Sequence, residues 1–257
     1  MGPRERIQLA INHQEPDRVP LDLGATSVTG VSASALHGLR VALGLSGPED
    51  PVKVVEPYQM LGEIAPDLMD ALSIDVVGLS SPRTMFGFEN LGWKEWTTFD
   101  GTPVLVPEGF NTTPEPSGDL LMYPEGDTSA PPSGRMPSGG WYFDSIVRQP
   151  AIDDAALDVE DNLEEFGPIS DADIAYYAEQ SERLFTQTDK AILANFGGTA
   201  FGDIDRPLLA GWYGSLGGSR WHVVCEYRLD SHGRGGRQKT RQTNNGRCES
   251  DRSTYRK

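Results

Sequence analysis

Hydrophobic and polar positions along the first part of the chain follow helical spacing in several short stretches. The segment RERIQLAIN after Pro3 predicts a helix, because its apolar residues Ile7, Ala10 and Ile11 share one face. Proline suits the first helical turn, where its missing N–H would have no partner. Leucines three or four residues apart predict a second helix over residues 31–43, which ends at Gly44.

Three apolar runs predict buried strands. They cover residues 19–23, 74–79 and 191–196, and nearly continuous apolar runs are typical of strands that are covered on both faces of a parallel sheet. The last run directly follows the clearest helix, SDADIAYYAEQSERLFTQTD, in which Ser170 and Asp173 form a capping signal. A helix, a short apolar strand and a glycine-rich loop in this order indicate an α/β fold with parallel strands.

The middle of the chain has a different pattern of residues. WKEWTTFDGTPVLV, residues 93–106, predicts a β-hairpin that turns at Asp100 and Gly101. Residues 107–140 then hold seven prolines and six glycines, which predicts a long loop without strands of its own. Such loops often act as lids or binding loops. Arg135, Trp141 and Tyr142 are candidate lid contacts to a substrate with carboxylates; a plain surface excursion is the alternative.

Charge and composition narrow the possible partners. The 257 residues carry 38 acidic and 22 basic side chains, and residues 1–210 alone carry a net charge of −22. Such a surface repels phosphate backbones, so nucleic acid is excluded as a partner. No stretch approaches the roughly 18 consecutive apolar residues of a membrane span. The N-terminus does not resemble a secretory signal, and the two cysteines both lie after residue 220, so a cytoplasmic location is expected.

If the three apolar runs are strands of an α/β barrel, substrate-binding residues are expected where each run ends. The candidates are Asp22, Gly24, Asp75, Asn195, Gly197, Gly198 and Thr199. The competing interpretation is that the aspartates cap helices or pair with arginines and that the glycines only form tight turns. The glycines do not match the dinucleotide-binding spacing. His222 and Cys225 lack the further ligands that a zinc site needs, so no metal site is predicted within this chain.

Several of these segments together resemble a known family. PRERIQLAINHQEPDRVPLDLGAT is similar to the opening of proteins in the uroporphyrinogen decarboxylase superfamily, in particular the branch shared with corrinoid-linked methyltransferases. The similarity continues through LSIDVVGL and YPEGDTSAPPSGRMPSGGWYFD to AILANFGGTAFGD, and so covers residues 3–204. It implies the N-terminal portion of a (β/α)8 TIM barrel, and a cytoplasmic enzyme that acts on a tetrapyrrole or on a corrinoid-bound methyl group.

The resemblance also sets expectations for cofactors and partners. An intact methyltransferase relative would use zinc and a corrinoid protein, and an oligomer is possible. The arginine-rich motif that binds substrate carboxylates in the decarboxylases is missing, because GATSVTG follows the first run and no arginine lies between this run and Arg40. SSPR follows the second run, where the decarboxylases carry their catalytic aspartate, so the catalytic residues stay unassigned. Methyl transfer is expected first, with uroporphyrinogen decarboxylation or a non-catalytic corrinoid- or tetrapyrrole-binding module as alternatives.

The resemblance stops abruptly near Asp205, and residues 205–257 differ from the rest of the chain. From Gly211 onwards the net charge is +6, and arginine, glycine and asparagine dominate. A basic tail that binds an anionic partner is one explanation. We expect instead a break in the reading frame near residues 205–212, because a barrel that ends at its third strand would leave an unpaired apolar edge. On this view the domain spans residues 1–204, the tail is disordered or out of frame, and the chain is inactive alone.

Overall fold

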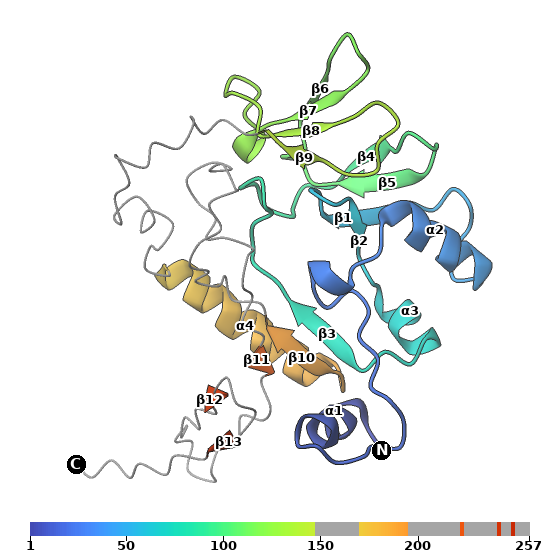
Figure 1. Ribbon diagram of the computed structural model, residues 1–257, viewed down its shortest axis with the longest axis vertical. Coiled ribbons are helices and arrows are strands. Elements are labelled where there is room, and N and C mark those ends of the chain that lie inside the picture. Colours follow the sequence, from blue (N-terminus) through green and yellow to red (C-terminus); the bar gives the residue numbers. More distant parts are fainter. Residues whose placement is uncertain (147–169, 195–221, 224–240, 243–247, 250–257) are drawn as a thin grey trace, which may run out of the picture. The chain divides into compact units, whose positions relative to one another are not determined.

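The computed structural model describes residues 1–146, 170–194, 222–223, 241–242 and 248–249 (Figure 1). The chain divides into two compact units, Met1–Val223 and Val224–Lys257. In the second unit, the described residues form one antiparallel pair of short strands, β12 (Arg241–Gln242) and β13 (Cys248–Glu249). All features discussed below belong to the first unit.

Three of the four helices, Pro3–Ile11, Ala33–Ala42 and Asp171–Gln187, lie close to where the sequence predicts them. The helices are α1 (Pro3–Ile11), α2 (Ala33–Ala42), α3 (Pro66–Ala71) and α4 (Asp171–Gln187), together with the short 3-10 turns η1 (Ser27–Thr29) and η2 (Pro124–Gly126). The predicted cap of α4 is confirmed, because the Ser170 hydroxyl accepts a hydrogen bond from the Asp173 N–H at 3.1 Å. Gly44 follows α2 with a φ of +70°, a conformation that glycine adopts without strain.

Two of the three predicted strands are present and pair in parallel. They are β3 (Val76–Leu79) and β10 (Ala191–Ala194), in a register that places Ala191 opposite Val76 and Ala194 opposite Leu79. The short strand β11 (His222–Val223) pairs with the other side of β10 in the antiparallel sense. Helix α4 packs against both β3 and β10 (Figure 1), as expected for a helix that leads into a parallel strand.

The prediction of a strand at residues 19–23 is wrong, although this segment does lie beside β3. The Asp75 N–H donates to the Leu21 carbonyl at 2.8 Å. The two segments therefore share one backbone hydrogen bond of the kind found between paired strands. Pro20 has no N–H to donate, and the Leu21 N–H is taken by the Asp75 carboxylate at 2.8 Å. The segment therefore runs as an extended edge without forming a strand.

The predicted hairpin at residues 93–106 is confirmed. It consists of β4 (Lys94–Thr97) and β5 (Pro103–Val106), and Gly101 occupies the turn with a φ of +84°. Strand β5 also pairs in parallel with β1 (Val52–Glu56), which pairs with β2 (Leu61–Gly62) in the antiparallel sense. The result is a four-stranded mixed sheet in the order β2-β1-β5-β4.

The prediction that residues 107–140 form a loop without strands is wrong. An antiparallel meander of four short strands begins in this stretch: β6 (Thr112–Pro114), β7 (Leu120–Met122), β8 (Gly134–Met136) and β9 (Asp144–Ser145). The prolines and glycines fall mainly at the turns; Gly118 and Gly139, for example, have φ values of +87° and +74°. Some of its large apolar residues lie in the core, where Met122 and Phe143 are fully buried.

The core lies mainly around the mixed sheet and the meander. Its centre is aromatic: Phe86 stacks with Phe88 at 6.2 Å between ring centroids and meets Phe143 edge to face at 5.9 Å. A smaller cluster is formed by Leu79, Ile192 and Ala194 under α4. Within the described part of the first unit the three sheets are open and none closes into a barrel. The α/β class predicted from the sequence is therefore confirmed at the level of a mixed α/β fold.

Candidate functional site

Asp22 and Gly24 build the turn that follows the extended segment. The Asp22 carboxylate accepts hydrogen bonds from the Ala25 N–H at 3.2 Å and from the Thr29 hydroxyl at 3.1 Å. Gly24 has a φ of +75°, and a Cβ at this position would lie 2.2 Å from Ile64 Cγ1. Gly24 therefore forms a tight turn, and the Asp22 carboxylate caps the backbone and the Thr29 hydroxyl beside it; the substrate-binding role of both residues stays a prediction.

Asp75 is fully buried and is surrounded by hydrogen-bond donors. Its carboxylate accepts from Arg6 of α1, from both terminal nitrogens of Arg18 at 2.7 and 2.9 Å, and from the Leu21 N–H at 2.8 Å. Arg6 also binds Asp17 through two hydrogen bonds of 2.6 and 2.9 Å. We call Arg6, Asp17, Arg18 and Asp75 the arginine–aspartate cluster.

The cluster fixes the charge state of its two carboxylates. Burial alone would raise the pKa of Asp75, but the hydrogen bonds from the Leu21 N–H, Arg18 and Arg6 hold it below its ordinary value. Hydrogen bonding to Arg6 lowers the pKa of Asp17 to about 2. Asp75 directly precedes β3 and so lies at the amino end of the strand. Chemistry in parallel α/β folds is found at the opposite, carboxyl end.

The carboxyl end of β3 carries hydroxyl groups. Ser81 accepts a hydrogen bond from the Arg83 N–H at 3.2 Å and is also hydrogen-bonded to the side chain of Tyr177 from α4, whose pKa is raised by burial. The hydroxyls of Thr26, after the extended segment, and Thr84, after β3, are buried and have no hydrogen-bond partner among the described residues. Buried hydroxyls normally have partners, so these two could bind polar groups of a ligand.

The remaining candidates from the third predicted loop are not described by the structure. Asn195, Gly197, Gly198 and Thr199 lie outside the described residues, so their part in a site stays a prediction. The structure places Asp22 and Gly24 in one turn and Asp75 at the amino end of β3.

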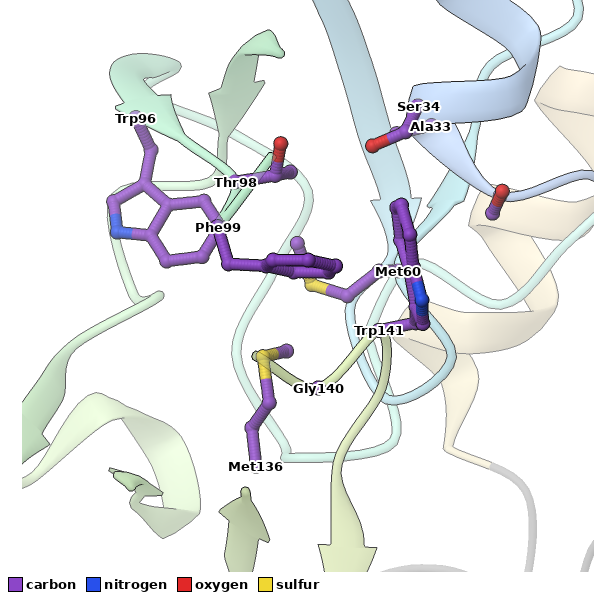
Figure 2. Close-up of a pocket in the computed structure, with 10 residues that line it drawn as sticks. Ala33, Ser34, Met60, Trp96, Thr98, Phe99, Met136, Gly140 and Trp141 are labelled. Carbon is purple, nitrogen blue, oxygen red and sulfur yellow. The ribbon is translucent and has the colours of Figure 1, made fainter. Parts of the chain in front are cut away.

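A hollow lies beside the β4–β5 hairpin and is lined by aromatic side chains from separate segments (Figure 2). Its cavity volume is about 10 Å³, which is about enough for one water molecule. Trp96 comes from β4, Phe99 from the hairpin turn, and Trp141 from the segment between β8 and β9. The Phe99 and Trp141 rings meet edge to face with centroids 4.3 Å apart. We call these three residues with Met60 and Met136 the aromatic hollow.

The candidate lid residues belong to the folded meander. Arg135 on β8 forms ion pairs with Glu115 at 3.3 Å and with Asp119, so its charge is already balanced by neighbouring carboxylates. Trp141 lines the aromatic hollow, while Tyr142 is 54% exposed and does not line it. A lid that uses Arg135 to hold a substrate carboxylate would first have to break both of these ion pairs.

The described residues do not fit a zinc site. Among them, no group of three histidine, cysteine, aspartate or glutamate side chains lies close enough together to hold a metal ion. A structural zinc site needs four such ligands and a catalytic one usually three. Zinc chemistry therefore has no residues to act through in the described part of the chain.

Sequence reasoning missed the residues that build the arginine–aspartate cluster and the aromatic hollow. Arg6 and Arg18 carried a detectable signal, because the aspartate in IDVVGL interrupts a run that must be buried, and a buried carboxylate needs cationic partners. The sequence could not say which arginines these would be. Trp96 and Phe99 come just before the predicted hairpin turn, but only the fold brings Trp141 to them.

Comparison with known proteins adds no relative. No protein-family model matches the chain, and no curated protein or solved structure is similar to it. Within the described residues, no helix combines the length and apolar character that crossing a membrane requires.

Proposed function

We propose that residues 1–204 are the first part of a (β/α)8 barrel of the uroporphyrinogen decarboxylase type, and that the intact barrel transfers a methyl group carried by a corrinoid. One observation carries this proposal: three segments lie side by side in chain order. The Leu21 carbonyl accepts from the Asp75 N–H, and a Cβ on Gly78 would come within 2.1 Å of the Ala25 carbonyl oxygen. The segment at residues 21–25 and β3 therefore run in the same direction.

Strand β10 follows β3 in chain order and is its neighbour in the sheet. Its residues pair with β3 in parallel, from Ala191 opposite Val76 to Ala194 opposite Leu79. Helix α3 leads into β3 and helix α4 leads into β10. Barrels of this class place successive parallel strands next to one another in chain order, with helices on the outside. Doubly wound sheets instead reverse the strand order near the first strand.

Methyl transfer is favoured over decarboxylation by the lack of cations after the first segment. Residues 24–30 offer hydroxyl groups but no arginine or lysine, and a substrate with many carboxylates needs cationic partners. Arg6 and Arg18 bind Asp75 at the amino end of β3. Among the described residues, Arg83 is the first cation after β3. This comparison supports the corrinoid proposal without assigning a catalytic residue.

A non-catalytic corrinoid- or tetrapyrrole-binding module is the second candidate. The observation in its favour is that the residues after β3 offer hydroxyls for binding, from Ser81 and Thr84, and that Tyr177 of α4 is hydrogen-bonded to Ser81. Zinc and a corrinoid protein would be needed only by the intact methyltransferase. Since the described residues do not fit zinc, we derive no step through it.

The deciding experiment is to resequence the gene from codon 195 through several hundred bases beyond the present stop. If a frame change restores alternating helices and strands with a His-x-Cys pair and a later cysteine, the barrel proposal and its zinc site gain direct support. A confirmed frame would contradict the proposal of an intact barrel relative.

The repaired chain would then be assayed with methylcobalamin as donor and a thiol as acceptor, alongside zinc analysis. Zinc-dependent loss of the methyl group from methylcobalamin is the expected result. Methyl transfer without zinc would contradict the zinc requirement, and no loss of the methyl group with zinc present would contradict the methyltransferase proposal. Saturable binding of cobalamin with no turnover in this assay or in a decarboxylation assay would support the binding module.

A further inference from the structure

We draw no further inference here: the strongest candidate, the exposed surface patch of Phe99, Trp141 and Tyr142 at the β4–β5 turn and in the segment between β8 and β9, carries none because nothing in the structure shows what covers it.

Discussion

At the scale of single residues, the fold depends most on the charge of Asp75. Its side chain is fully buried, and an ionised carboxylate is costly to bury unless it is paired and hydrogen-bonded. Arg6 and Arg18 supply that pairing from α1 and from the segment before residue 19, so one carboxylate joins the start of the chain to β3. The cluster thus has a structural role, at the amino end of the strand.

Replacing Asp75 by asparagine should therefore destabilise the protein strongly. The variant keeps the size of the side chain but leaves two guanidinium groups facing a neutral partner, and we expect the free energy of unfolding to fall by roughly 3 kcal/mol. Urea denaturation followed by tryptophan fluorescence measures it. Asp67→Asn is the matched control, because it breaks the exposed ion pair with Arg40 and should cost less than about 1 kcal/mol. Equal losses in both variants would contradict this role for the cluster.

The cluster also predicts how stability responds to acid. Asp17 has a pKa of about 2 in the folded protein against an ordinary value of 3.8. A lowered pKa means that its stabilisation is complete above about pH 4 and is lost as the pH falls towards 2. Asp17→Asn should therefore be less stable than the natural chain at pH 5, and this difference should shrink as the pH approaches 2. A difference that stays constant across this range would refute the assignment.

At the scale of elements, local signals predicted the helices and the hairpin because each signal depends on a few neighbouring residues. Ser170 with Asp173 marked α4, and Asp100 with Gly101 marked the β4–β5 turn. The meander was missed because its apolar residues are sparse and its strands have two or three residues each. Composition alone cannot distinguish such strands from a proline- and glycine-rich loop, since pairing between distant segments decides the outcome.

The candidate site was less predictable than the elements. The sequence located the ends of the apolar runs, yet the placement of Asp75 before β3 follows from the register with β10, which no local pattern contains. The aromatic hollow combines side chains more than forty positions apart in the chain, such as Phe99 and Trp141. Contacts of this kind depend on the tertiary fold.

The contact between the extended segment and β3 gives a prediction about elements. A Cβ on Gly78 would lie 2.1 Å from the Ala25 carbonyl oxygen, which is backbone and cannot turn aside. Gly78→Ala should therefore push the segment away from β3 and reduce the free energy of unfolding by roughly 1–3 kcal/mol. Gly38→Ala is the control: it lies in α2 with no atom within 4 Å of the added Cβ, and alanine should stabilise the helix by up to about 1 kcal/mol. Unchanged stability in Gly78→Ala would show that the segment does not pack there.

At the scale of the whole molecule, this chain differs from a barrel at the edge of β10 that does not pair with β3. A barrel would continue with a parallel strand at this edge, whereas β11 pairs there in the antiparallel sense. Strand β11 lies after residues 205–212, where the resemblance ends. An altered reading frame would account for both facts, because the new sequence would not have been selected to extend a parallel sheet.

Removing Val224–Lys257 tests whether the C-terminal unit contributes to the fold. This unit carries nine basic and four acidic residues and few large apolar ones, so it has little surface whose burial could stabilise the rest of the protein. A chain that ends at Val223 should therefore keep the urea midpoint of the full chain at high salt, where charge effects are screened. At low salt it should be slightly less stable, because the net charge changes from −16 to −21 and self-repulsion grows. A clear loss of stability at high salt would instead mean that the unit packs against the rest as a selected part of the protein, and the altered reading frame would have to be abandoned.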